Sequence, residues 1–223
     1  MSGQLQDKIR NAFQWLKKFS APPLISDVET LVEFVRTRSA YIGQTSLYGY
    51  LKTRMGTRYR DYFDDDRFST SMRIAAVKVS LACREDLSIF AAATAGRDGR
   101  MTPQQITELS CYCFENALNK MIEGDDRRNL PKDTVAVFRQ RAGLTDWNNA
   151  AVGENAFSRS PLDLVQYAPV VDEFKVLDRQ IVMNSIRFRW RDIRDRFQKS
   201  LRAEAVCRDW FEKQVSANAL EPR

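Results

Sequence analysis

The placement of glycine and proline most constrains the fold of this chain, because these residues interrupt helices and favour turns. The 223 residues include nine glycines and seven prolines, and most of them lie between stretches whose apolar residues recur with helical spacing. After Pro169 neither residue type occurs until Pro222. The pattern predicts an all-α protein with a single helical domain over residues 1–223, about six to seven helices, and a long C-terminal helix over residues 170–216.

Two capping boxes mark predicted helix starts, Ser26 with Glu29 and Thr102 with Gln105. In each pair, the side chain of one residue can accept a hydrogen bond from the free backbone N–H of the other. Apolar residues follow both pairs at helical spacing. Between these two helices, the Ala-rich run over residues 72–95 is apolar on most sides, which is typical of a central, buried helix.

An amphipathic helix is predicted at the N-terminus, over residues 1–20. Its apolar residues share one face and are Leu5, Ile9, Phe13 and Leu16. The opening letters MSGQLQDKIR contain no apolar core of signal-peptide length, and no run of the chain approaches the roughly 18 apolar residues of a membrane-spanning helix. We therefore expect a cytoplasmic protein, with a peripheral position on the inner face of a membrane as an alternative.

The chain contains no histidine. This absence removes the commonest general base, the usual zinc ligand and every Ser-His-Asp or Cys-His arrangement. The four cysteines are expected to be reduced, small and buried, and they are Cys83, Cys111, Cys113 and Cys207. The sequence predicts no cofactor and no metal site.

Positive charge is concentrated in residues 187–202, which hold seven basic and two acidic side chains, against a formal net charge of +6 for the whole chain. On a helical wheel, Ile186, Trp190, Ile193 and Phe197 form an apolar stripe with arginines at its edges. Pairs such as Arg191 with Asp195, four residues apart, favour a stripe packed on the core with a solvated outer face. The excess of arginine instead indicates a docking surface. Its predicted residues are Arg187, Arg191, Arg194, Arg202 and Trp190.

A second basic stretch runs from Tyr48 to Arg60 and alternates aromatic with cationic side chains. Its candidate binding residues are Lys52, Arg54, Arg58 and Arg60. Such interleaving can stack bases and hold phosphates. Because no nucleic-acid-binding motif surrounds the stretch, nucleic acid is a less favoured partner.

Two acidic segments and one loop-like segment could suggest metal chemistry. One holds Asp61, Asp64, Asp65 and Asp66, and another holds Glu123, Asp125 and Asp126 beside Arg127 and Arg128. Helical enzymes that act on prenyl diphosphates hold Mg²⁺ with two acidic motifs, whereas these acids fall in predicted connectors, which favours solvated loop charge. Residues 94–105 follow the later part of an EF-hand loop, with too few carboxylates for calcium.

The segment from Phe34-Val-Arg-Thr-Arg38 through SLYGYLKTRMGTRY to Phe90 resembles an uncharacterised bacterial family whose members sometimes carry esterase names. That name implies a serine nucleophile and an oxyanion hole. The chain has no G-x-S-x-G elbow and no histidine base.

These observations favour a non-catalytic helical adaptor or assembly factor that binds an acidic protein surface or an anionic membrane face. The alternatives are an enzyme, either a hydrolase by family name or a Mg²⁺-dependent helical enzyme, and a nucleic-acid-binding protein.

Overall fold

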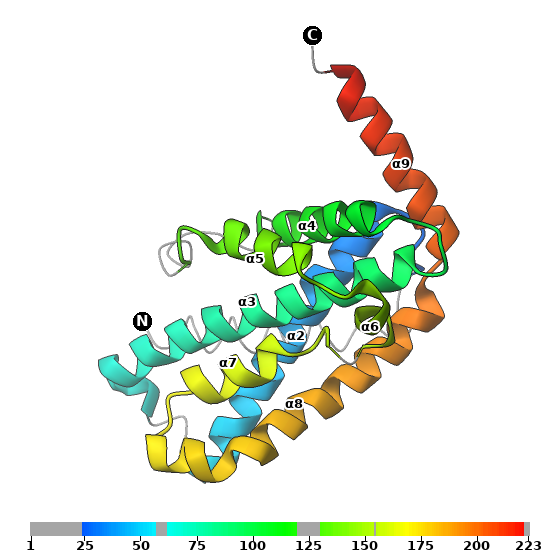
Figure 1. Ribbon diagram of the computed structural model, residues 1–223. Coiled ribbons are helices and arrows are strands. Elements are labelled where there is room, and N and C mark those ends of the chain that lie inside the picture. Colours follow the sequence, from blue (N-terminus) through cyan, green and yellow to red (C-terminus); the bar gives the residue numbers. More distant parts are fainter. Residues whose placement is uncertain (1–23, 57–61, 120–129, 154, 221–223) are drawn as a thin grey trace.

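The computed structural model describes residues 24–56, 62–119, 130–153 and 155–220 (Figure 1). These residues form eight helices and no strand, which confirms the all-α prediction with more helices than expected. The helices are α2 (Val28–Met55), α3 (Asp66–Gly96), α4 (Pro103–Asn119), α5 (Thr134–Gly143), α6 (Trp147–Val152), α7 (Arg159–Tyr167), α8 (Asp172–Ser200) and α9 (Ala203–Leu220). The helix predicted over residues 1–20 lies outside the described residues.

Helix α3 is the centre of the molecule, as its Ala-rich sequence predicts. Every residue over 81–96 is buried, and the helix packs against α2, α4, α6, α7 and α9. Small alanine side chains let neighbouring helices approach α3 closely on several sides. At its end, a Cβ on Gly96 would lie 2.5 Å from Ile106 Cγ1, so the hydrogen of glycine is needed where α3 and α4 meet.

The start of α2 differs from the predicted capping box by one residue. Asp27, not Ser26, is the N-cap: its Oδ1 accepts the Thr30 N–H at 2.7 Å, and Thr30 Oγ1 accepts the Asp27 N–H at 3.3 Å. Asp209 of α9 accepts the next free N–H, from Val28, at 2.8 Å. The predicted box at Thr102 and Gln105 is confirmed, with bonds of 2.9 and 3.3 Å.

The single helix predicted over residues 170–216 is wrong, because the chain leaves helical geometry at Leu201 and forms α8 and α9. Ile25, which is fully buried, forms a parallel β-bridge with Leu201. Its N–H donates to Ser200 O at 3.0 Å, and its carbonyl accepts the Arg202 N–H at 2.8 Å. This distant segment supplies the backbone hydrogen bonds that a continuing helix would otherwise make. The first part of α9 packs against α2 and α3, and its C-terminal part extends away from the other helices (Figure 1).

One face of α8 packs against α2 and α7. The predicted stripe of Ile186, Trp190, Ile193 and Phe197 is buried, with no side chain more than 4% exposed. The stripe therefore faces the core. It is not part of a surface, and Trp190 has to be removed from the predicted docking residues.

Candidate functional site

The turn between α3 and α4 holds two arginines at the surface. After Gly96 the chain turns through Asp98 and Gly99, whose φ angles of +61° and +78° lie in the left-handed region. The Met101 N–H donates to Gly96 O at 3.2 Å, and Arg100 Nη1 donates to Arg97 O at 2.7 Å. Residues 94–105, which resemble part of an EF-hand loop in the sequence, form a closed turn in the structure, followed by the capping box of α4.

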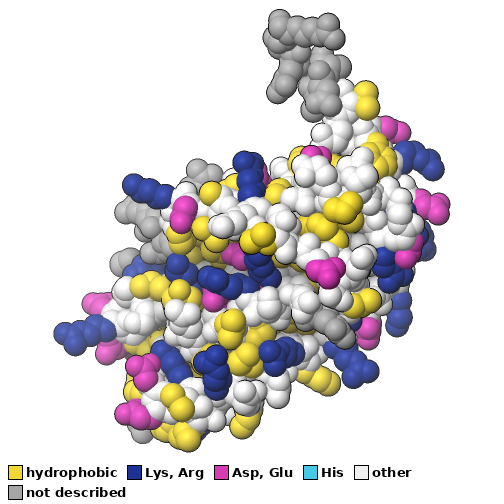
Figure 2. All heavy atoms as spheres, viewed as in Figure 1, with side chains coloured by type: hydrophobic (Ala, Val, Ile, Leu, Met, Phe, Trp, Pro, Cys, Tyr) yellow, Lys and Arg dark blue, Asp and Glu magenta, His cyan; other side chains and the backbone are white. Residues whose placement is uncertain are grey.

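This turn lies beside the junction between α8 and α9 and lines an open hollow with it. The hollow has a volume of about 390 Å³, and its lining residues are Thr94, Arg97, Asp98, Arg100, Gln198, Leu201 and Ala203. Lys199 and Arg202, both exposed, flank the lining residues of α8 and α9 in the sequence. We call Arg97, Arg100, Lys199 and Arg202 the basic corner. Figure 2 shows Lys and Arg side chains gathered on this side of the molecule, at the right of the view.

Charges in the basic corner are only partly compensated. Asp98 is 3.3 Å from both Arg97 and Arg100, so one carboxylate is shared between two guanidinium groups. Lys199 and Arg202 form no ion pair with any described residue, and Arg202 Nη1 donates to Leu201 O at 3.4 Å. The corner is therefore a concave surface with an excess of positive charge.

The structure separates the residues predicted as one docking surface on the long helix. Arg187 and Arg191 are exposed on α8, and Arg202 is in the basic corner. Arg194 is half-buried: its Nη2 donates to Val152 O, and its guanidinium carbon lies 5.7 Å from the centre of the Phe90 ring. Arg194 therefore packs α8 against α3 and the end of α6. Sequence reasoning missed Arg97 and Arg100, because only the fold brings the α3–α4 turn to the end of α8.

The second predicted basic stretch lies near the other end of α8. Arg54 of α2 is paired with Asp178, and its guanidinium carbon lies 4.6 Å from the centre of the Phe174 ring. Tyr50 is buried and donates its hydroxyl to Asp178 at 3.0 Å, so it is not available to stack on a base. Lys52 is exposed, whereas Arg58 and Arg60 lie outside the described residues. Arg189 of the first basic stretch does lie beside Gly49 of this one, with its Nη2 3.5 Å from where a Cβ on Gly49 would be. Arg54 and the basic corner are far apart, since Asp178, the partner of Arg54, and Lys199 are about 31 Å apart along the helix.

We expect the Tyr50–Asp178 bond to make stability depend on pH under alkaline conditions. Burial, aided by the hydrogen bond to Asp178, raises the pKa of Tyr50 from 10.0 to about 12. The unfolded chain then loses this proton first, so stability falls as the pH rises from 10 to 12, by up to about 1.4 kcal/mol per pH unit. Urea unfolding of wild type and Tyr50→Phe should show their difference shrinking over this window, and parallel pH profiles would contradict the assignment.

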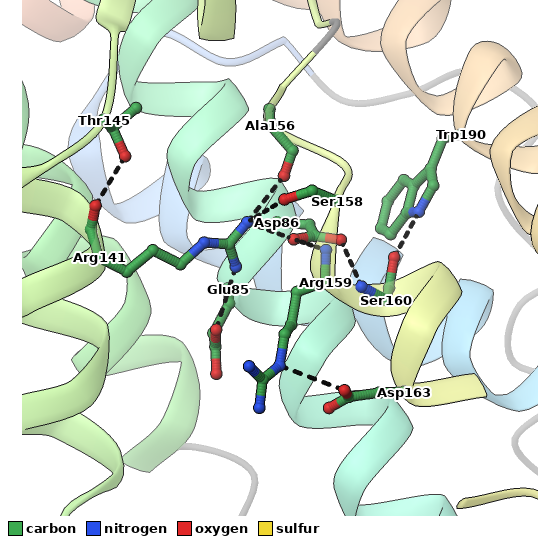
Figure 3. A network of polar contacts seen from close by, with 10 residues as sticks. All are labelled: Glu85, Asp86, Arg141, Thr145, Ala156, Ser158, Arg159, Ser160, Asp163 and Trp190. Carbon is green, nitrogen blue, oxygen red and sulfur yellow. Dashed lines mark hydrogen bonds and ion pairs between the residues drawn. The ribbon is translucent and has the colours of Figure 1, made fainter. Parts of the chain in front are cut away.

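A buried polar network joins α3, α5, α7 and α8 (Figure 3). Asp86 of α3 is fully buried, and its carboxylate accepts Arg141 Nη2 at 2.7 Å and the N–H groups of Arg159 and Ser160 at 3.2 and 2.8 Å. Ser158 makes no capping bond, so Asp86 satisfies the first N–H groups of α7 from another helix. Trp190 Nε1 donates to Ser160 Oγ at 3.0 Å and connects α8 to the same point.

A second open hollow, of about 570 Å³, lies beside this network and is lined in part by Glu85, Gln140, Arg141, Asn155 and Arg159. Burial raises the pKa of Glu85 and of Asp163, while the neighbouring arginines act in the opposite direction. Arg141 contacts Glu85 at 3.0 Å in addition to Asp86, and Arg159 contacts Asp163 at 3.2 Å. These groups satisfy one another, so the network is a structural connection between helices.

The two serine hydroxyls of this region, at Ser158 and Ser160, are hydrogen-bonded to the side chains of other residues. Ser158 Oγ accepts from Arg141 at 3.3 Å, and Ser160 Oγ accepts from Trp190. Neither hydroxyl donates to a carboxylate within the part of the chain that the structure describes, and the chain has no histidine. An activated serine of the kind that an esterase needs is therefore not formed by these residues.

In the acidic segment before α3, Asp64, Asp65 and Asp66 are described and exposed, and one of them is a helix cap. Asp65 caps α3 by accepting the N–H groups of Arg67 and Phe68. Asp61 and the segment from Glu123 to Arg128 lie outside the described residues. Among residues 24–56, 62–119, 130–153 and 155–220, no three His, Cys, Asp or Glu side chains come together as metal ligands would.

The four thiols are free, and burial raises the pKa of each. Cys113 faces the core, whereas Cys111, two residues earlier on α4, is half-buried. A raised thiol pKa keeps the protonated form, which is a poor nucleophile and a poor metal ligand. The cysteines thus act as packing residues in this structure.

No described helix combines the length and the apolar character needed to cross a membrane. Comparison of the chain with protein-family models, with curated proteins and with solved structures finds no match.

Proposed function

We propose that the protein is a non-catalytic adaptor or assembly factor that binds an acidic segment of a partner protein at the basic corner. The observation that carries this proposal is the hollow between the α3–α4 turn and the α8–α9 junction, which Arg97 and Arg100 line. The exposed cations Lys199 and Arg202 lie next to it. Arginine is enriched in protein interfaces because its planar guanidinium can hold a carboxylate with two hydrogen bonds.

The shape and charge of the corner favour a protein partner over a bilayer. A protruding acidic side chain can enter a concave hollow, whereas a flat layer of lipid headgroups contacts only its rim. Asp98 and the exposed Glu204 also lie at the corner, and a uniformly anionic surface would repel both. A partner protein can place a polar or basic group against each of them.

Nucleic acid is less favoured for a separate reason. Tyr50 and Arg54 of the second basic stretch are both bound to Asp178. They tie α2 to α8 and are not free to stack a base or hold a phosphate. The basic corner itself contains no aromatic lining residue.

The test replaces the four cations of the corner, Arg97, Arg100, Lys199 and Arg202, with glutamine. A matched control replaces four exposed cations elsewhere, Arg67, Arg73, Lys132 and Arg179, with glutamine, so that both variants lose the same charge. The probe is a fluorescent twelve-residue Glu/Asp-rich peptide, followed by anisotropy. We expect the corner variant to bind the peptide about tenfold more weakly than the wild type, and the affinity of the control to change about twofold or less. Added salt should lower the affinity of the wild type more than that of the corner variant.

Parallel titrations use vesicles of phosphatidylglycerol with phosphatidylcholine, and a single-stranded oligonucleotide. If the wild type bound the vesicles or the oligonucleotide more tightly than the peptide, and the corner variant lost this binding, that ligand and not an acidic protein would be the partner. If both variants bound the peptide equally more weakly than the wild type, only net charge would matter, and the basic corner would not be a docking site.

A further inference from the structure

The outer face of α8 carries an exposed apolar stripe made of Phe174, Leu177, Ile181 and Phe188. Their exposed fractions are 42, 72, 73 and 73%. At 100° per residue these four side chains lie within about 60° of one another, opposite the buried stripe that contains Trp190. Their separations of three, four and seven residues match the heptad spacing of a helix–helix seam. Hydrophobic side chains are visible over α8 along the lower edge of Figure 2.

Charged residues beside this stripe complement a second α8 that runs antiparallel to the first. Glu173, Arg187 and Arg191 lie on the same edge of the helix, between about 220° and 260° on a wheel that starts at Phe174. In a twofold pair centred on Ile181, Glu173 lies about 12 Å from the axis. On that same side, Arg187 and Arg191 of the second copy lie about 9 and 15 Å from the axis. Each glutamate then lies between two arginines of the other copy.

These three residues are available for such contacts. The ion pair described in the first turn of α8 joins Lys175 to Asp172 and leaves Glu173 exposed. Arg187 donates to Asn184 Oδ1 at 3.3 Å, and neither Arg187 nor Arg191 forms an ion pair with a described residue. A parallel twofold pair would place this edge of the two copies on opposite sides of the seam, so Glu173 of one copy would not meet Arg187 or Arg191 of the other.

We propose that the protein forms a twofold-symmetric homodimer in which the Phe174–Leu177–Ile181–Phe188 stripes of two antiparallel α8 helices pack together. A face that is apolar, exposed and self-complementary in charge is what an isologous interface requires. Lys199 is about 27 Å from the axis, so the two basic corners lie at opposite ends of the helix pair. The dimer is independent of the proposed function, and either can fail alone.

The first test measures the association of the full chain by sedimentation equilibrium. Ile181→Lys places two like charges at the axis of the dimer, whereas Val176→Lys adds the same charge to α8 away from the stripe. Both positions are about three-quarters exposed, so neither change should disturb the folded monomer, and circular dichroism checks this. We expect Ile181→Lys to raise the dimer dissociation constant by about tenfold or more, and Val176→Lys by about twofold or less.

The second test fixes the orientation of the helices. Glu173→Arg alone, or Arg187→Glu with Arg191→Glu, should each weaken the dimer, and the three changes together should restore it, because only an antiparallel pair exchanges these charges. A wild-type chain that stays monomeric at high concentration overturns the proposal, including the case in which residues 1–23 cover the stripe. A dimer that survives Ile181→Lys, or that responds equally to Val176→Lys, overturns it as well.

Discussion

Replacing Asp86 with alanine is expected to lower the free energy of unfolding by about 3–5 kcal/mol. The change leaves Arg141 without one of its two carboxylate partners. It also leaves the N–H group of Arg159 and the buried N–H group of Ser160 without this acceptor. Lost bonds to a charged group, and the free N-terminus of α7, both add to the effect. Thermal and urea unfolding measure it directly.

Two further variants make the Asp86 result specific. Asp86→Asn keeps the volume but turns an N–H donor toward the Ser160 N–H or the Arg141 guanidinium, so it should also destabilise, by less than alanine. Asp192→Ala removes an exposed aspartate whose ion pair with Arg196 is 3.9 Å long, and it should cost about 0.5 kcal/mol or less. If Asp86→Ala behaved like Asp192→Ala, the network would not hold these helices together.

Replacing Trp190 with alanine should cost about 3–5 kcal/mol, because the ring is 1% exposed and its removal leaves a large cavity. The Trp190 ring centre lies 4.6 Å from that of Phe157, and its Nε1–H is the bond donor to Ser160. Trp190→Phe keeps the aromatic contact and loses the hydrogen bond, so it should cost less. Unfolding by urea and near-ultraviolet circular dichroism report both effects.

Val176→Ala is the control for this position, since Val176 lies on the same helix and is 76% exposed. It should change the free energy of unfolding by about 0.5 kcal/mol or less. The two positions separate a core role from a surface role. A Trp190→Ala protein with wild-type stability and lost binding would place the indole on a docking surface instead of in the core.

Asp86 and Trp190 both form hydrogen bonds with Ser160, so substitutions at the two positions should influence each other. Asp86 accepts the Ser160 N–H, and Trp190 donates to the Ser160 hydroxyl. Residues that share a partner rarely have additive effects, so the double variant should differ from the sum of the single ones. Helix α7 is therefore held in place by α3 on one side and α8 on the other.

The sequence determined the fold class and much of the helix pattern by local physics. Scarce glycine and proline, helical spacing and the Thr102–Gln105 box specify helices through contacts within a few residues. The Ala-rich run of α3 also revealed its central position, because a helix that is apolar on most sides has to be covered on most sides. The buried stripe of α8 could be identified in the same way from its period.

The sequence could not reveal features that depend on distant partners. No local signal ends α8 at Ser200, where the break follows from backbone hydrogen bonds to Ile25, and Asp209 helps to fix the start of α2 from the other end of the chain. The residues around Asp86 in the sequence do not show that it accepts hydrogen bonds at the start of α7, because that role depends on how α3 and α7 pack.

The candidate site shows the same division. Arginine content marked residues 187–202 as basic, but it could not distinguish Arg194, which packs against Phe90, from the exposed Arg202. It also could not bring Arg97 and Arg100 to the end of α8. Local spacing decides which residues share a helix face, whereas only the packing of helices decides which face is covered and which turns become neighbours.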